Sequence, residues 1–146
     1  MNTEIFLPIF YMLCLTTAVF LFSTLIRIKE IYLNDSKNAI SGSEHKHPPF
    51  QQGSDILKNS QRNLANLFEF PIFFYLVCVI IVITDKVDES FITLAYWFFY
   101  LRLVHSIYHI FFNQLIIKNG FPLRSLIWAP STIVILLMWV KLISTF

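Results

Sequence analysis

Four long apolar segments dominate this chain and leave few folds open to it. They cover about residues 5–26, 64–83, 91–117 and 126–143, with polar segments between them. A helix needs roughly 20 apolar residues to cross the hydrocarbon core of a bilayer, so each segment is long enough to span a membrane. We therefore predict an all-α membrane protein, a bundle of four transmembrane helices that forms one domain over residues 1–146. Pro130 predicts a kink in the fourth helix.

The composition agrees with a membrane protein. Hydrophobic residues make up 56% of the chain and charged residues 14%, whereas soluble domains are about 45–50% apolar and about 25% charged. The net charge of +2 is too small to indicate a nucleic-acid partner, and no basic tract is interleaved with aromatic residues. Cys14 and Cys78 lie inside apolar segments, without the spacing of a metal site. The first partner that we expect is therefore the lipid bilayer.

The basic residues are shared unequally between the loops. The first loop, residues 27–62, is rich in Lys and Arg, and the third loop is flanked by Lys118 and Arg124. The second loop, residues 84–90, is short and acidic. Cytoplasmic loops of membrane proteins carry an excess of Lys and Arg. We predict an integral, multi-pass protein with loops one and three in the cytoplasm and both termini on the other side.

Ionisable residues inside the apolar segments indicate a site. Glu69 lies in the second segment, where a carboxylate in hydrocarbon costs about 3 kcal/mol and therefore faces a partner or a cavity. Arg62, Asn66 and Glu69 fall at i, i+4 and i+7, so they share one helical face. The third segment carries a second polar stripe, formed by Arg102, His105, His109 and Asn113. We predict that the two stripes face each other and outline a polar pocket.

These polar stripes have several interpretations. Glu69 and Arg102 could form a buried ion pair that only fixes the register of the helices. The other donors exceed what one pair needs, and they suit a small zwitterionic ligand whose ammonium group binds the carboxylate and whose own carboxylates bind arginine. His105 and His109 have the i, i+4 spacing of a metal or haem site. Only Glu69 is available as a further ligand, so we expect no metal.

In the second and third helices the chain resembles the MAPEG family, the membrane-associated proteins in eicosanoid and glutathione metabolism. The second helix of that family carries an arginine, an asparagine and a glutamate shortly before a proline, which is similar to Arg62, Asn66, Glu69 and Pro71. Its third helix carries an arginine with His or Tyr three residues later, which is similar to Arg102 and His105.

The ends of the other two helices extend the resemblance over nearly the whole chain. Arg124 resembles the catalytic arginine that begins the fourth helix in this family, and Arg27 resembles an arginine found where the first helix ends. Two positions depart from the pattern, because Phe70 and His109 stand where members of the family often have tyrosine.

The resemblance implies a homotrimer of four-helix bundles that binds glutathione between subunits, near the cytoplasmic face. Carried over by position, Glu69 holds the amino group of glutathione. Arg124 is the catalytic residue, since a nearby cation favours the thiolate, which is the nucleophile. Arg62, Asn66 and Arg27 bind the carboxylates and backbone of glutathione. We also predict that the polar stripe of the third segment takes part in glutathione binding, through Arg102, His105, His109 and Asn113.

Two classes of function follow. The first is a glutathione-dependent membrane enzyme, a transferase or a peroxidase, that acts on lipophilic substrates with glutathione as co-substrate and without a metal. The alternative is a non-enzymatic MAPEG-like membrane protein that binds a lipid or a partner. Arg124 separates them, because catalysis needs this residue beside the thiol. A transporter or channel subunit is disfavoured, since the four segments show no inverted repeat or broken helix.

Overall fold

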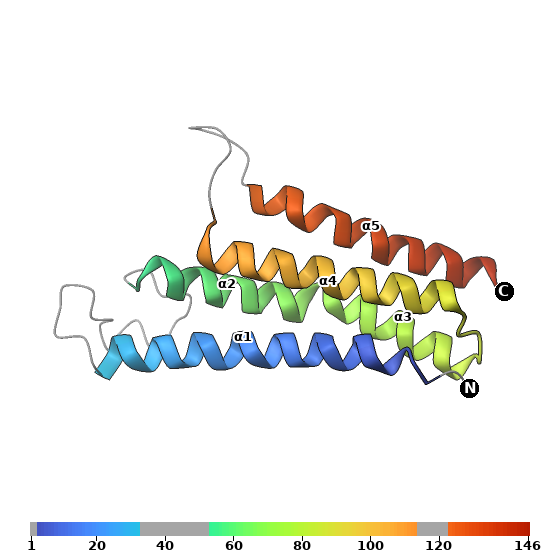
Figure 1. Cartoon of the computed structure of the whole chain (residues 1–146), viewed down its shortest axis with the longest axis horizontal. Helices are drawn as coiled ribbons and strands as arrows, with labels where there is room; N and C mark the ends of the chain where they lie inside the picture. Colours follow the sequence, from blue (N-terminus) through green and yellow to red (C-terminus); the bar gives the residue numbers. More distant parts are fainter. Residues whose placement is uncertain (1–2, 33–52, 114–122) are drawn as a thin grey trace.

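Five helices make up the part of the chain that the structure describes. The structure is a computed structural model, and it describes residues 3–32, 53–113 and 123–146. Its helices are α1 (Phe6–Tyr32), α2 (Asp55–Glu69), α3 (Pro71–Ile83), α4 (Glu89–Phe111) and α5 (Leu123–Ser144), as Figure 1 shows. No strand occurs in these ranges. Because α2 and α3 follow each other in one rod (Figure 1), the molecule is a bundle of four rods, and the predicted fold class is confirmed.

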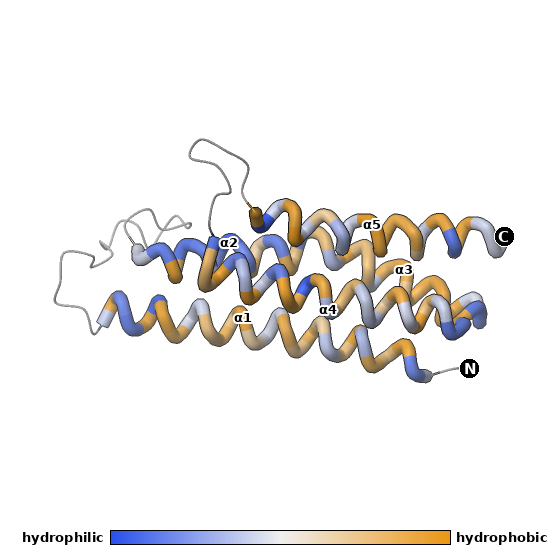
Figure 2. Tube along the Cα trace, turned by 45° about the horizontal axis from the view of Figure 1, so that its top comes forward, coloured by the Kyte–Doolittle hydropathy of each residue, from blue (hydrophilic) through white to orange (hydrophobic). Residues whose placement is uncertain are grey.

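Most of the surface of the rods is apolar. The rods α1, α2–α3 and α5 are each long and apolar enough to cross a membrane. The 23 residues of α4 have a similar length, but this helix carries the polar stripe. Large apolar side chains such as Leu25, Ile83 and Ile143 are exposed, and Figure 2 shows apolar residues along every rod. Lipid accepts such a surface, and the chain is an integral membrane protein.

The core lies between α1, α3 and α4. Met12 of α1 and Phe74 of α3 are fully buried, as is Phe98 of α4. The rings of Phe74 and Phe98 are stacked with their centroids 4.5 Å apart. Helix α5 packs on the outside of this unit, against α4 and α3. The polar residues of α2 and α4 are thereby brought beside the beginning of α5.

The second rod begins earlier than the apolar segment from which it was predicted. The prediction was residues 64–83, whereas α2 begins at Asp55 with several polar turns (Figure 2). The side chain of Ser54 caps the helix by accepting a hydrogen bond from the N–H of Leu57 at 3.3 Å. The buried carboxylate of Glu30, near the end of α1, accepts hydrogen bonds from both the N–H and the hydroxyl of Ser54. These contacts tie the polar start of α2 to α1.

A break at Phe70 separates α2 from α3, and the sequence analysis did not predict it. Pro71 has no N–H group, so it cannot donate to the carbonyl of Leu67 one turn earlier. The ring of Phe70 packs against Trp128 of α5, with the centroids 5.0 Å apart. The break places Glu69 at the end of α2, where its side chain is exposed on the isolated chain. By contrast, α5 continues through Pro130 as one helix.

Helix α4 ends earlier than predicted. The apolar segment suggested a span to residue 117, but the helix ends at Phe111. The N–H groups of Phe112 and Asn113 both donate to the carbonyl of Tyr108, each at 3.0 Å. Asn113 then has a φ of 37°, a left-handed conformation that asparagine tolerates better than most residues. The side chain of Asn113 therefore sits at a fixed turn and not on a continuing helix.

The two termini and the turn between α3 and α4 lie at the same end of the bundle (Figure 1). Lys141 of α5 forms an ion pair with Asp88 of the turn, with Nζ and Oδ2 2.6 Å apart. Burial by itself would raise the pKa of Asp88. Hydrogen bonds from Lys141, from the N–H of Phe91 and from the hydroxyl of Ser90 outweigh this effect and hold the pKa below its ordinary value.

We expect Lys141→Met to lower the Tm slightly at neutral pH, because an ion pair at the surface contributes about 0–1 kcal/mol. The folded-state pKa of Asp88 is depressed, so the stabilisation is present above the unfolded-state pKa of about 3.9 and is lost as the pH falls through the folded value. The Tm difference between wild type and variant should therefore shrink below about pH 4. Thermal unfolding of both proteins across this pH range checks the prediction. A Tm difference that does not change with pH would mean that Lys141→Met acts through lost packing.

Candidate functional site

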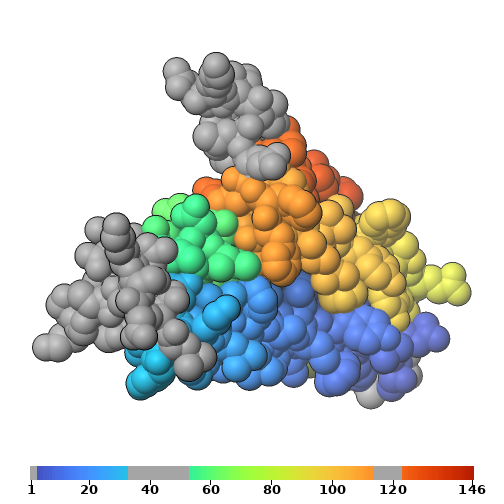
Figure 3. Space-filling view, turned by 60° about the vertical axis from the view of Figure 1, so that its left-hand side comes forward, coloured from blue at the N-terminus to red at the C-terminus, as the bar shows by residue number. Residues whose placement is uncertain are grey.

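A polar cavity lies between α2, α4 and α5, toward the end of the bundle opposite the termini. Its volume is about 360 Å³, and it is lined by Arg62, Ala65, Asn66, Glu69, His109 and Arg124. Figure 3 brings this end of the molecule forward and shows the beginning of α2 beside the end of α4. Five of the residues predicted for the site, from three different helices, thus line one cavity.

Two further cavities adjoin the first. One of about 260 Å³ lies between Asn66, His105 and the first turns of α5, where Arg124, Ser125 and Trp128 line it. The other, of about 460 Å³, lies between α1 and α2 and shares Arg62 and Ala65 with the polar cavity. It contains Arg27 and has apolar walls, formed in part by Phe20, Leu64 and Phe68. His105 and Arg27 are therefore neighbours of the polar cavity.

Arg102 is buried next to the polar cavity. Its Nη2 donates a hydrogen bond to the backbone carbonyl of Asn66 at 3.0 Å. Its Nε and Nη1 have no hydrogen-bond partner within the described ranges. Glu69 and Arg102 were predicted to pair directly or through a bound ligand. The direct pair is not formed, since the ion pairs found in the described residues join other side chains. The physical reason is the geometry of the break, which leaves Glu69 exposed at a helix end while Arg102 is fully buried.

The two histidines of α4 are almost completely buried. The Nδ1 of His105 lies 3.2 Å from the carbonyl oxygen of Arg124, and because a carbonyl only accepts, Nδ1 carries the proton in this contact. Both ring nitrogens of His109, which lines the polar cavity, lack a partner among the described residues. In that same part of the chain, no three His, Cys, Asp or Glu side chains are grouped so that they could hold a metal ion.

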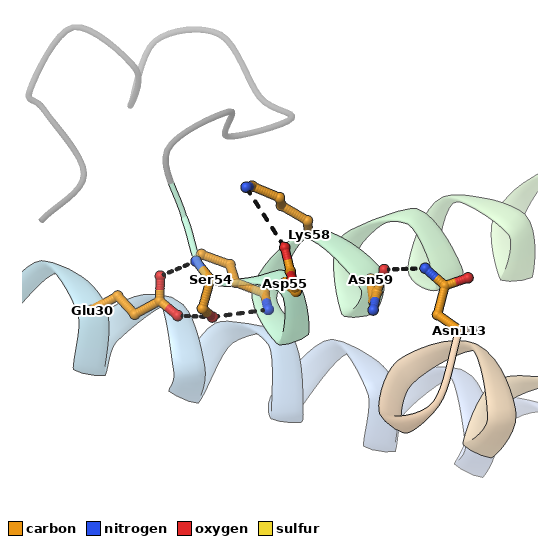
Figure 4. A network of polar contacts seen from close by, with 7 residues as sticks. Glu30, Ser54, Asp55, Lys58, Asn59 and Asn113 are labelled. Carbon is orange, nitrogen blue, oxygen red and sulfur yellow. Dashed lines mark hydrogen bonds and ion pairs between the residues drawn. The ribbon is translucent and has the colours of Figure 1, made fainter. Parts of the chain in front are cut away.

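The sequence analysis missed two asparagines in the polar first turns of α2. The side-chain oxygen of Asn63 accepts a hydrogen bond from the hydroxyl of Ser106 at 3.4 Å. The side-chain oxygen of Asn59 accepts one from Nδ2 of Asn113 at 2.7 Å (Figure 4). Asn59, Asn63 and Asn66 have the spacing i, i+4 and i+7, so they extend the predicted stripe. The spacing would have indicated both asparagines if the second helix had been predicted to begin before its apolar part.

The chemistry of the polar cavity suits a small molecule with charges of both signs. Arg62 and Arg124 supply guanidinium groups, which bind carboxylates through paired N–H donors. Glu69 supplies a carboxylate for an ammonium group, and Asn66 supplies an amide. The unpartnered nitrogens of Arg102 and His109 add buried hydrogen-bonding capacity, which a polar ligand would satisfy.

The fold and this cavity define a class, an integral membrane protein whose helices line an open pocket with charges of both signs. Comparison with protein families matches the MAPEG family over residues 5–144. The chain belongs to the MAPEG family, the membrane-associated proteins in eicosanoid and glutathione metabolism, so the resemblance drawn from its motifs is confirmed. No curated protein and no solved structure matched the chain.

Proposed function

We propose that this protein is a glutathione-dependent membrane enzyme, a transferase or a peroxidase, that acts on lipophilic substrates. The observation that carries the proposal is the polar cavity, because Glu69 and Arg124 line it together with Arg62 and Asn66. Glutathione carries one ammonium group, two carboxylates and a thiol. Glu69 has the charge to bind the ammonium group, Arg62 a carboxylate and Arg124 the thiolate, and membership of the family supports glutathione as the co-substrate.

The proposed roles follow from charge and position. Glu69 binds the ammonium group of glutathione. Arg62, which lies on the same helix, binds a carboxylate of glutathione. Asn66 hydrogen-bonds the peptide backbone. Arg102 offers its two unpartnered donors from the buried side, and Arg27 contributes from the adjoining cavity.

Arg124 acts on the thiol. A guanidinium group beside the sulfur stabilises the thiolate relative to the thiol, so a larger fraction of bound glutathione is reactive. The thiol proton leaves to water, and the sulfur forms a bond to the electrophilic carbon while the leaving group departs with its electron pair. With a hydroperoxide, the sulfur attacks oxygen instead, and a second glutathione completes the reduction to disulfide, alcohol and water.

The cavity between α1 and α2 supports a lipophilic second substrate. Its walls include Phe20, Leu64 and Phe68, and it adjoins the polar cavity at Arg62. An apolar molecule can enter it from the bilayer while glutathione enters from the aqueous side. The same apolar walls also support the second candidate function, a non-enzymatic membrane protein that binds a lipid.

We also propose that three copies assemble, with the site between subunits and in the cytoplasmic half of the membrane. Arg62 and Glu69 are exposed on the side of the isolated chain, where contact with hydrocarbon would be costly, and a neighbouring subunit would cover them. The end of α1, helix α2 and the beginning of α5 lie toward the end opposite the termini (Figure 1), and they carry Arg27, Arg62 and Arg124, which supports a cytoplasmic position for that end. Sedimentation of the detergent complex tests the trimer, and accessibility labelling of cysteines placed at each end tests the orientation.

Titration calorimetry with the detergent-purified protein tests the function. We expect saturable binding of glutathione and of S-methylglutathione, and conjugation of a chlorodinitrobenzene with glutathione only. Lys58→Ala, a change on the exposed side of α2 outside the cavity, is the matched control and should behave as wild type. If glutathione does not bind at millimolar concentration, the proposal fails. If it binds but neither conjugation nor hydroperoxide reduction occurs, the non-enzymatic function replaces it.

A further inference from the structure

Arg124 is attached to α4 at two separate points. Its backbone carbonyl accepts a hydrogen bond from Nδ1 of His105 at 3.2 Å. Its Nη1 donates to the side-chain oxygen of Asn113 at 2.9 Å. One contact fixes the main chain at the beginning of α5, and the other fixes the end of a long, rotatable side chain. The orientation of the guanidinium group therefore depends on Asn113.

Asn113 is in turn attached to α2. Its Nδ2 donates to the side-chain oxygen of Asn59 at 2.7 Å (Figure 4), while its own oxygen accepts from Arg124. A side-chain amide can donate and accept at the same time, which a carboxylate or an ammonium group cannot do. Asparagine also tolerates the left-handed φ of 37° at this position. Both the chemistry and the backbone of the site thus fit asparagine.

We propose that Asn113 is a positioning residue, an amide bridge from α2 to α5 that holds the guanidinium group of Arg124 at the polar cavity. The inference rests on the proposed function, in which Arg124 stabilises the thiolate. From its place in the polar stripe of the third segment, Asn113 was predicted to bind glutathione directly. In this structure both ends of its amide are already engaged by protein, so Asn113 acts on the thiol through Arg124.

The bridge also depends on the corner between α1 and α2. Ser54, one turn before Asn59, donates to the carboxylate of Glu30 with its N–H at 3.1 Å and with its hydroxyl (Figure 4). A Cβ added to Gly53 would meet Cδ2 of Leu57 at 2.9 Å, so this corner is closely packed. The polar first turns of α2 therefore form a fixed support for Asn59, and through Asn113 for Arg124.

Asn113→Gly tests the bridge, because glycine accepts the left-handed φ while the amide is removed. We expect kcat for conjugation to fall about tenfold, as a hydrogen bond to a charged group contributes about that factor. The Kd of glutathione should stay within about twofold. The acidic limb of the pH–rate profile should move to higher pH, since a displaced cation favours the thiolate less. Asn59→Ala should act in the same direction, and Lys58→Ala should change none of these quantities.

An unchanged kcat and an unchanged acidic limb in Asn113→Gly would overturn the inference. So would a lower Tm with an unchanged limb, because that result assigns a structural role only. Asn59→Ala carries the same test if Asn113→Gly does not fold. A double-mutant cycle of Asn113→Gly with Arg124→Ala, read as Tm without glutathione, separates the inference from the proposed function. Coupled Tm changes support the bridge even if glutathione fails to bind, and additive changes refute it.

Discussion

Arg124→Ala should lower kcat for glutathione conjugation by about a hundredfold, the usual loss when one charge-stabilising group is removed from a reacting centre. The Kd of glutathione should remain within about threefold of the wild-type value, because the other groups that line the cavity hold the rest of the molecule. The physical reason is that the cation stabilises the thiolate, which carries the reaction, more than it stabilises the bound thiol. Steady-state kinetics together with calorimetry on the same preparation check both quantities.

Arg124→Lys is the informative control. Lysine keeps the positive charge but lacks the planar fork that bonds Asn113 while facing the cavity. We expect its kcat to lie between those of the wild type and Arg124→Ala. If Arg124→Ala instead weakens glutathione binding and leaves kcat at saturation unchanged, then Arg124 is a binding residue and the catalytic assignment is wrong.

Glu69→Gln should have the opposite profile. We expect the Kd of glutathione to rise by about 10- to 100-fold, because a hydrogen bond between charged groups contributes about 1.5–3 kcal/mol. The kcat at saturating glutathione should change by less than about threefold, since the ammonium group is remote from the sulfur and its binding energy is the same in the ground and transition states. Calorimetry and kinetics with the same two proteins measure this.

A glutathione analogue without the α-amino group supplies the matched control. The wild type and Glu69→Gln should bind the analogue with nearly equal Kd values, because the carboxylate then has no ammonium partner. If Glu69→Gln weakens the binding of this analogue as much as that of glutathione, Glu69 shapes the cavity without contacting the amino group.

The architecture was predictable because the thickness of a bilayer sets the length of apolar segment that a spanning helix needs. The ends of the helices were not, since they depend on polar contacts between segments far apart in the chain. Helix α2 begins at Asp55 because Glu30 and Ser54 meet. Helix α4 ends at Phe111. The turn that follows it contains Asn113, whose side chain contacts Asn59. The apolar pattern of a sequence does not show which polar residues of distant segments contact each other.

The grouping of several polar residues around one cavity was predictable from helical spacing, but their contacts with one another were not. Spacing placed Arg62, Asn66 and Glu69 on one face, and the structure brings that face to His109 and Arg124. The rule that opposite charges in a membrane pair with each other then predicted that Glu69 and Arg102 pair directly or through a bound ligand, and the direct pair is not formed. The rule considers side chains only and leaves out the main chain.

Near the break before Pro71, the main chain itself contacts Arg102. Without an N–H group at Pro71, the carbonyl of Leu67 has no donor in the next turn, and the neighbouring carbonyl of Asn66 accepts from Arg102. A peptide carbonyl of α2, next to the one that Pro71 leaves without its helical donor, thus binds one nitrogen of a buried cation. The carbonyl binds this nitrogen without introducing a second net charge, and Glu69 forms no ion pair with Arg102 in the described residues. The carboxylate of Glu69 is thereby left available for a cation that arrives from outside the protein.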